Sequence, residues 1–365
     1  MKKTYKYRLL ANKSTFSKAA EWLVLCQNLY NAALEQRIKY YRQKGQTITC
    51  YSQIKQLPEL RAAFPEYEEI GSQVLQDVIE RLDKTFKAFF SRVKNGGIKA
   101  GFPRFKSKDR YDSFTLKQTG WKLEGNLLNI RNIGRFKLRL SRPVEGNIKT
   151  VTIHRELCDH WYVCFACDNV PERKLAPSNK SVGIQMGNDY FLADSDGGRQ
   201  EHPKYLQRAE KQLRIRQRML SRRIKGSHRR QKARILLAKN YEKITNQRDY
   251  FLHKIANKYI ANYGAIYVED FDIKEIDKEH TLAKTVRDAS WGKFFELLNY
   301  KAEDAGRSLI KVPYSEIASE TCSACGAINS DIISRDGQWV CSVCGVLHDS
   351  SSDIAKNILR VGQTL

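Results

Sequence analysis

Two short cysteine pairs constrain the fold of this chain more than any other feature of its sequence. Cys322 and Cys325 form one Cys-x-x-Cys pair, Cys341 and Cys344 form another, and 15 residues separate the two. Two thiolates on one tight turn can bind one side of a metal ion, and a second such turn completes a tetrahedron with Zn–S distances of about 2.3 Å. A glycine follows the second cysteine of each pair, where the turn needs a permissive backbone. The spacing therefore predicts a zinc ribbon, which we place at 319–346.

The alternative for either cysteine pair is a redox role. Four thiolates around one ion leave no open coordination position, so we expect the zinc to be structural. The other five cysteines are scattered through a chain of 365 residues and do not form a disulfide framework. Bound metal in a reducing cytoplasm fits this use of cysteine.

The net charge of the chain indicates what kind of partner it binds. Lys and Arg outnumber Asp and Glu by 64 to 40, which leaves a formal charge of +24. Such a surplus attracts a polyanion, and nucleic acid is the first candidate. A ribosome-associated protein or a peripheral membrane protein is also compatible with this charge. No apolar run reaches the roughly 18 residues of a membrane span, and the first residues alternate instead of forming an apolar signal core.

The positive charge is concentrated in one predicted helical hairpin, which spans 204–262 and turns at Gly226–Ser227. Glu210 is the only acidic residue between 204 and 239. Charges of one sign repel each other unless an anion neutralises them, which favours a nucleic-acid-facing hairpin over an inert solvated one. An apolar seam is expected from Leu206, Leu213, Leu220 and Ile224. The predicted nucleic-acid contacts are Arg214, Arg218, Arg222, Arg223, Arg229 and Arg230.

A second basic segment, 96–110, combines glycines, aromatic residues and positive charge. This mixture is typical of a loop that contacts phosphates while its aromatic side chains stack on bases. The alternative is a solvated connector. The predicted phosphate contacts are Arg104, Lys106, Lys108 and Arg110.

The remaining periodicities predict a mixed α/β chain. Alternation predicts a strand at 3–10, and helical spacing predicts core-forming helices over about 14–42 and 72–94. Short alternating strands between 111 and 170 indicate a small antiparallel barrel or sheet. Beyond the linker that follows, strands alternate with helices, as in an α/β domain. These strands are expected at 181–184, 190–194, 265–268 and 309–312, and the helices at 291–307 and 352–361.

Four motifs together resemble the transposon-encoded RNA-guided nucleases called TnpB, relatives of the type V CRISPR effectors. They are Gly-Phe-Pro-Arg-Phe-Lys-Ser-Lys (101–108), Ser-Trp-Gly-Lys-Phe (290–294), Tyr-Lys-Ala-Glu-Asp-Ala-Gly (300–306) and Thr-Cys-Ser-Ala-Cys-Gly (321–326). The resemblance implies a RuvC-like domain of RNase H fold, with the basic helical hairpin and the zinc ribbon as insertions, beside an N-terminal lobe. The implied domains are a wedge-like β-barrel at 1–12 and 96–175, a helical recognition domain at 13–95, and the RuvC-like domain at 178–318 and 347–365 with its hairpin at 203–262.

The same resemblance implies a nuclease site in which three carboxylates hold two divalent ions. The family's first carboxylate is the aspartate of a Gly-Ile-Asp-x-Gly strand, where this chain has Gln185. The second matches Glu269. The third opens an Asp-x-Asn-Ala-Ala-x-Asn-Ile helix start, and gap-free counts from both sides place Ser351 there. Glutamine and serine lack the charge that holds Mg²⁺, so we expect a vestigial site without magnesium.

Neighbouring acids could in principle replace the missing carboxylates. The candidates are Asp189 and Asp194, which follow Gln185, and Asp349 and Asp353, which flank Ser351. A shift of one or two residues along a strand or a helix start changes the face on which a side chain emerges, so we do not expect such a replacement at both positions.

The selective loss of two ligands predicts a nuclease-dead RNA-guided DNA-binding protein, and therefore not an enzyme. On this interpretation it binds DNA beside a short adjacent motif and represses transcription by occupancy. The expected partners are a guide RNA and double-stranded target DNA, without a membrane, with one monomer per guide RNA, in the bacterial cytoplasm at the nucleoid. The alternative is an RNA-guided DNA endonuclease with a rearranged RuvC metal site. A nuclease inactivated in the laboratory is a third interpretation, which the replacement of the whole stretch 349–354 disfavours.

Overall fold

The computed structural model describes residues 1–96, 100–107, 110–187, 190–270, 289–313, 320–329 and 337–365. The chain divides into two compact units, Met1–Pro171 and Glu172–Leu365, which we call unit 1 and unit 2. None of the described helices combines the length and the apolar character that a membrane span requires. Predicted Lys108 and the candidate acid Asp189 lie outside the described residues.

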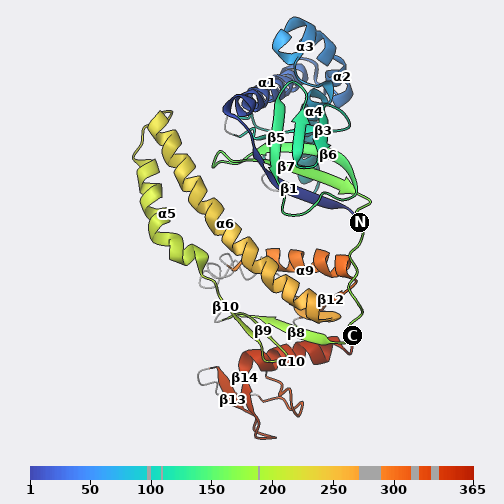
Figure 1. The fold of residues 1–365 in the computed structure, drawn as a ribbon, viewed down its shortest axis with the longest axis vertical. Helices are drawn as coiled ribbons and strands as arrows, with labels where there is room; N and C mark the ends of the chain where they lie inside the picture. The colour runs from blue at the N-terminus through green and yellow to red at the C-terminus, as the bar shows by residue number, and fades with distance from the viewer. Residues whose placement is uncertain (97–99, 108–109, 188–189, 271–288, 314–319, 330–336) are drawn as a thin grey trace. The chain divides into compact units, whose positions relative to one another are not determined.

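Unit 1 contains a seven-stranded antiparallel sheet with the strand order β2-β6-β7-β1-β5-β4-β3 (Figure 1). The first strand pairs with β7 on one side and β5 on the other, so it lies inside the sheet. Tyr5, Tyr7 and Leu9 alternate into the core, as the sequence predicted. The strands are β1 (Lys3–Leu10), β2 (Ser113–Leu116), β3 (Trp121–Glu124), β4 (Leu127–Ile130), β5 (Gly134–Arg139), β6 (Asn147–Arg155) and β7 (Trp161–Asp168).

Two long helices cover the core of unit 1. They are α1 (Lys13–Lys44) and α4 (Ser72–Lys94), and both predicted helices are confirmed. The side chain of Asn12 accepts a hydrogen bond from the backbone nitrogen of Thr15 at 2.8 Å and so caps the start of α1. Two short helices lie between them, α2 (Cys50–Lys55) and α3 (Leu57–Ala63), which the sequence patterns did not indicate.

Unit 2 is built on a five-stranded sheet with the strand order β10-β9-β8-β11-β12. The three strands β8, β11 and β12 run parallel, while β9 and β10 form an antiparallel hairpin beside β8. The predicted strands and helices of this unit are confirmed. The strands are β8 (Ser181–Met186), β9 (Tyr190–Asp194), β10 (Arg199–Glu201), β11 (Ala265–Asp270) and β12 (Ser308–Pro313).

Helices cover both faces of this sheet. On one face Val182 and Ile184 pack against α6 (His228–Asn262) and α9 (Trp291–Ala305). The other face carries α10 (Ser350–Gly362), which approaches so closely that a β-carbon at Gly183 would collide with the carbonyl oxygen of Ala355. Glycine is therefore required at this point of β8.

The predicted helical hairpin is confirmed, and its two helices are α5 (Tyr205–Ser221) and α6. Leu213 is buried against α6, but Ile224 is 81% exposed, so its place in the predicted apolar seam is wrong. The reason is that α5 ends at Ser221, and Ile224 falls in the turn beyond the helical repeat.

Candidate metal centre and nucleic-acid-facing residues

The four cysteines of the predicted ribbon come together in unit 2. The sulfur atoms of Cys322 and Cys344 are 3.7 Å apart, those of Cys325 and Cys341 are also 3.7 Å apart, and all four lie within 4.8 Å of one another. A tetrahedral zinc ion with Zn–S bonds of about 2.3 Å needs sulfur atoms about 3.8 Å apart. The cluster therefore fits a structural zinc ion.

The backbone at each cysteine pair prepares the sulfurs for a metal. Gly326 and Gly345 adopt φ angles of 79° and 70°, the left-handed conformation that glycine accepts without strain. Hydrogen bonding from the backbone of Cys344 lowers the pKa of the Cys341 thiol to about 6, and the side chain of Asn329 assists. The thiolate is the form that binds zinc, so the lowered pKa favours the binding form of this one cysteine.

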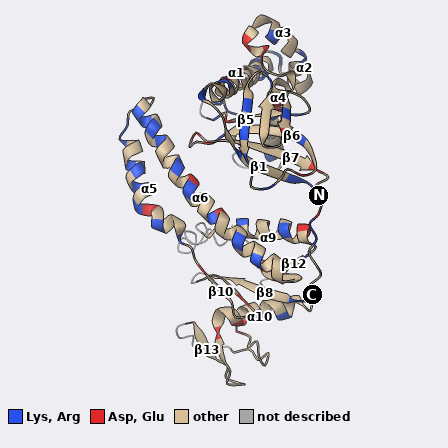
Figure 2. Ribbon diagram, in the orientation of Figure 1, with Lys and Arg blue, Asp and Glu red and all other residues tan. Residues whose placement is uncertain are grey.

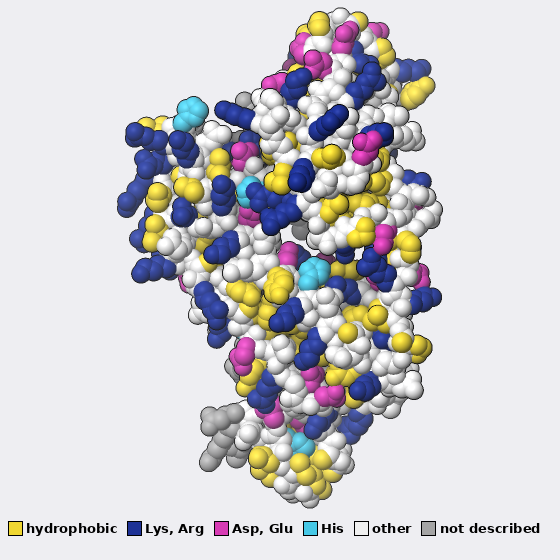
Figure 3. Space-filling model, in the orientation of Figure 1, with side chains coloured by type: hydrophobic (Ala, Val, Ile, Leu, Met, Phe, Trp, Pro, Cys, Tyr) yellow, Lys and Arg dark blue, Asp and Glu magenta, His cyan; other side chains and the backbone are white. Residues whose placement is uncertain are grey.

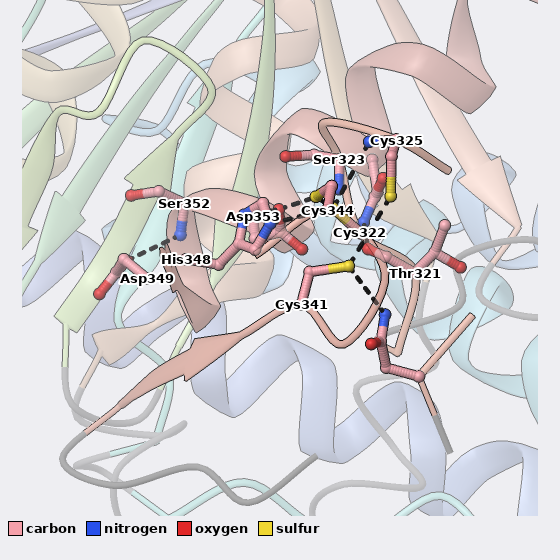
Figure 4. Close-up of polar contacts among 12 residues, drawn as sticks. Thr321, Cys322, Ser323, Cys325, Cys341, Cys344, His348, Asp349, Ser352 and Asp353 are labelled. Atoms are coloured by element: carbon pink, nitrogen blue, oxygen red, sulfur yellow. Dashed lines mark hydrogen bonds and ion pairs between the residues drawn. The ribbon is translucent and has the colours of Figure 1, made fainter. Parts of the chain in front are cut away.

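A buried chain of side chains connects the cysteine cluster to α10 (Figure 4). His348 Nε2 lies 3.0 Å from the sulfur of Cys322, and its Nδ1 lies 2.8 Å from Asp353 Oδ1. The same carboxylate oxygen accepts a hydrogen bond from the backbone nitrogen of Ser323 at 3.1 Å. The ring of Trp339 stacks on the imidazole at 4.6 Å. Carboxylate and histidine partners of this kind fix the orientation of metal ligands.

The contacts of His348 and Asp353 were not predicted from the sequence, in which Asp353 was weighed only as a replacement nuclease ligand. The histidine belongs to β14 (Leu347–Asp349), which pairs with β13 (Gln338–Val340) next to the cysteines. A histidine four residues after the last cysteine was the available signal, but only the fold shows which sulfur it contacts.

The structure brings the three nuclease-family positions to one face of the five-stranded sheet. In the parallel pair of β8 and β11, Ile184 lies opposite Val268, so Gln185 and Glu269 follow as neighbours on the face that bears α10. Ser351 precedes Ala355 by one helical turn and so lies on the helix face that packs on β8.

The chemistry of these three side chains differs from that of a carboxylate triad. The Oε1 atom of Gln185 is buried without a hydrogen-bond partner. Burial raises the pKa of Glu269, which favours its neutral form. Two divalent ions need several anionic oxygens, which an amide, a hydroxyl and one half-buried acid do not supply. These residues do not fit the two-metal site that the resemblance implies.

Each described candidate for a replacement acid has a structural partner. Asp194 accepts hydrogen bonds from the hydroxyl of Tyr259 at 2.7 Å and the backbone nitrogen of Gly198 at 2.6 Å. Asp349 forms an ion pair with Arg199 and caps α10 through Ser352, at 3.0 Å. Asp353 is held by His348, as described above.

The predicted arginines of the hairpin are mostly exposed. Arg214, Arg218, Arg222, Arg223 and Arg229 are exposed. Lys and Arg positions recur along the ribbons of α5 and α6 (Figure 2), and blue side chains gather on that part of the surface (Figure 3). A polyanion can reach these five guanidinium groups.

Arg230 has a different environment from the other predicted hairpin contacts. Its Nη1 donates hydrogen bonds to the carbonyl oxygens of Leu220 at 2.9 Å and Arg223 at 2.8 Å. These carbonyls lie at the end of α5 and in the turn, so Arg230 stabilises the turn of the hairpin.

The basic loop of unit 1 is fixed to α1. The backbone nitrogen of Lys106 donates to Asn31 Oδ1 at 2.8 Å, and its carbonyl accepts from Gln27 at 2.7 Å and from Asn31 at 2.9 Å. Arg104 and Arg110 are exposed beside it. Within the described part of this segment, the backbone at Lys106 is therefore held against α1.

Two family models match this chain. Residues 164–279 match the OrfB_IS605 family, described as "Probable transposase", and residues 291–358 match the family described as "Cas12f1-like, TNB domain". The second match contains the cysteine cluster and the first nine residues of α10.

Two curated relatives extend the similarity along the chain. A "Putative RNA-guided DNA endonuclease" of Streptomyces pristinaespiralis is 27% identical over 99% of this chain and 90% of its own length. A "Putative RNA-guided DNA endonuclease InsQ" of Escherichia coli (strain K12) is 26% identical over 93% of this chain and 87% of its own. A solved structure of the mini-RNA-guided endonuclease CRISPR-Cas_phi3 shares the fold, with a TM-score of 0.50 and 10% identity over 99% of this chain and 92% of that one.

These relatives correct one prediction. Their names are those of endonucleases, which contradicts the expectation that the protein is not an enzyme. That expectation rested on the residues at positions 185, 269 and 351 and on the view that neighbouring acids do not replace the missing carboxylates. The matches support the broader resemblance drawn from the sequence: the chain is similar to the TnpB-like RNA-guided nucleases over nearly its whole length.

Proposed function

We propose that this protein is an RNA-guided DNA endonuclease of the TnpB kind, acting through a metal-ligand set that differs from the RuvC-like triad. The observation that carries the proposal is the similarity to named RNA-guided DNA endonucleases over 99% of the chain. The alternative named in the sequence analysis, a rearranged nuclease site, thus replaces its first interpretation.

The charges of the hairpin support nucleic acid as the partner. Arg222 and Arg223 are exposed beside the turn, and Glu210 is the only acid in the sequence from 204 to 239. A guide RNA and a double-stranded DNA are the expected partners, with the DNA sequence read by base pairing and the protein holding the backbones. A protein with this role would work as one monomer per guide RNA in the bacterial cytoplasm, at the nucleoid.

The topology of unit 2 supports a RuvC-like domain. Three parallel strands flanked by an antiparallel hairpin bring Gln185 and Glu269 to neighbouring places, with the start of α10 on the same face. We assign the RuvC-like domain to 178–318 and 347–365, with the ribbon at 319–346. The wedge-like barrel at 1–12 and 96–175 and the recognition helices at 13–95 complete the proposed organisation.

Glu269 is the residue that the proposed cleavage most requires. Of the three family positions it alone carries a carboxylate in this sequence. A rearranged site needs further oxygens from elsewhere, and the described acids near the family positions are engaged in other contacts. The proposal therefore requires these contacts to open, or ligands from outside the described residues.

A guided cleavage experiment tests the proposal. The full chain is purified from its host, the RNA that comes with it is sequenced, and a matching DNA duplex is incubated with the complex in Mg²⁺ or Mn²⁺. We expect cutting that needs the guide match and disappears in Glu269→Gln. The exposed Glu296 on α9 offers a matched control, because Glu296→Gln removes the same charge away from the site.

Two results would count against the proposal in different ways. The absence of a discrete copurifying RNA would contradict the proposal that the protein is guided by RNA. Guide-dependent binding without any cutting would contradict the proposed endonuclease activity. Occupancy of DNA, as in transcriptional repression, would then be the activity left to measure.

A further inference from the structure

A cluster of phenylalanine rings lies in unit 1 where α4 ends and the basic loop begins. Phe86 packs against the hydrophobic core, with the guanidinium of Arg37 5.1 Å from its ring centre. Phe102, from the loop, meets Phe86 and Phe89 edge to face, with ring centres 5.8 and 5.4 Å away. Phe90 completes the cluster at 5.2 Å from Phe89 and 6.2 Å from Phe86. We call these four rings the phenylalanine platform.

The outer rings of the platform are open to solvent. Phe90 is 53% exposed and Phe102 is 49% exposed, although both sit on other aromatic rings. Single exposed apolar side chains are common on proteins, whereas a contiguous exposed group marks an interaction surface. The platform therefore has the character of a binding surface.

The charges around the platform indicate the chemistry of its partner. The sequence from 84 to 107 contains no acidic residue. A partner that offers both flat aromatic faces and repeated negative charge matches this surface, and nucleic acid has both features. On α4 the exposed basic residues on the side of these rings are Lys87 and Lys94, with Arg104 in the loop, and Lys87 also forms an ion pair with Asp83 at 3.0 Å. We call these three basic residues the basic rim.

The platform is also ordered before any partner arrives. The loop that supplies Phe102 is held to α1 through the backbone of Lys106, which bonds to Asn31 and Gln27. Rings that are already fixed lose little conformational entropy on binding, so their stacking contributes more of its energy to affinity.

We infer that the phenylalanine platform stacks unpaired bases of single-stranded RNA, while its basic rim contacts the RNA phosphates. A duplex hides the faces of its bases within the stack, so aromatic side chains bind bases that are unpaired. In the proposed function the guide RNA offers unpaired bases before the target is bound, whereas the DNA offers them only after the guide has displaced one of its strands. The inference rests on the proposed function only in naming the guide as the source of this RNA.

Binding of a labelled single-stranded oligoadenylate RNA to the full chain tests the inference directly. We expect Phe90→Leu and Phe102→Leu to weaken binding roughly tenfold or more, because leucine keeps an apolar side chain but cannot stack. Phe90→Trp should retain the affinity. The dependence of the affinity on salt should stay unchanged in these variants, whereas Arg104→Gln should reduce its slope by about one charge.

Tyr41→Leu provides the matched control, because Tyr41 on α1 is 58% exposed and belongs to no ring cluster among the described residues. Wild-type affinity in both platform leucine variants would overturn the inference. Tighter binding of the deoxy strand than of the single-stranded RNA would overturn the assignment to RNA, and tighter binding of a blunt RNA duplex would overturn the assignment to unpaired bases. The guided cleavage assay tests the proposed function separately from the platform. Cutting can fail while the platform still binds RNA, and RNA binding by the platform can fail while the protein still cuts.

Discussion

The cysteine cluster and the sheet face that carries Gln185 and Glu269 both involve the start of α10, but their ligand sets differ in completeness. At the cluster, four sulfurs have the spacing of a zinc tetrahedron, and Asn329 and His348 contact two of them. At the face of β8 and β11, an amide oxygen is buried without a partner beside one acid with a raised pKa. The complete ligand set of four cysteines thus has supporting contacts, and the incomplete ligand set on the sheet face lacks them.

The geometry of α10 explains how one helix start can serve two such different regions. Ser351 and Asp353 are two residues apart, which on an α-helix places their side chains on nearly opposite sides. Ser351 belongs to the side that packs on β8, while Asp353 reaches His348 and the first cysteine turn. Changes on the sheet side can therefore leave the ribbon side intact.

Removal of one zinc ligand should produce the largest effect. Cys341→Ser replaces the sulfur whose pKa is lowered to about 6. We expect zinc to be lost and the ribbon and the start of α10 to lose order, at a cost of several kcal/mol, because the binding energy of a structural zinc is folding energy. Metal analysis and hydrogen exchange over 320–362 measure this.

Cys50→Ser is the matched control for this prediction, since Cys50 is a half-buried free cysteine of unit 1. One zinc per chain in Cys341→Ser, with unchanged exchange in α10, would contradict the structural role of the cluster.

Removal of the imidazole that contacts the cysteine cluster should produce the next largest effect. His348→Gln removes the imidazole between Cys322 and Asp353 and leaves the four sulfurs in place. We expect zinc affinity to fall by about tenfold to a hundredfold, as for other partners of metal ligands. Competition with a chelator measures the affinity, with Val343→Ala, an exposed residue of the same ribbon, as the control. Equal affinities in wild type and His348→Gln would show that the imidazole serves packing alone.

The sequence predicted the two regions to different extents for physical reasons. Cysteine spacing is a local property, because each turn holds its own pair, so the cluster could be predicted without a fold. The alternation of Tyr5, Tyr7 and Leu9 likewise predicted a strand, but its place between β5 and β7 depends on pairings more than 100 residues away. Periodicity cannot report such long-range pairing.

Side-chain contacts were the least predictable part of the candidate sites. Arg230 looks like its neighbours in the sequence, yet its guanidinium binds two carbonyl oxygens of the hairpin turn. Asp353 was weighed in the sequence only as a replacement nuclease ligand, and the structure places it beside His348. Charge and spacing identify a region, and only the fold shows which partner each side chain has.

Restoring both acids should change how the sheet face responds to magnesium. In Gln185→Asp with Ser351→Asp, three carboxylates would repel one another without a cation, so we expect lower stability than wild type in chelator. Saturating Mg²⁺ should then raise the free energy of unfolding of the variant by about 1–3 kcal/mol, because a ligand that binds only the folded state stabilises it. Denaturant unfolding with and without Mg²⁺ measures the difference.

Gln185→Asp with Ser350→Asp is the control for that comparison. It adds the same charge, but residue 350 precedes 351 by about 100° around α10. An equal magnesium effect in wild type would mean that the existing ligands already form a site there, and the two regions would be more alike than their sequences indicate.

The smallest expected effect concerns Glu269 itself. Burial raises its pKa in the folded state above the unfolded value of about 4.3, so the folded state favours the protonated acid. Wild type should therefore lose stability as the pH rises through the folded-state pKa, whereas Glu269→Gln carries no charge and should not. We expect the variant to be more stable at neutral pH by less than about 1 kcal/mol, with the difference vanishing in acid. Unfolding at a series of pH values, in chelator and with Glu296→Gln as the exposed control, measures this. A less stable variant at neutral pH would mean that ionised Glu269 has a stabilising partner in the folded state, as a metal ligand would.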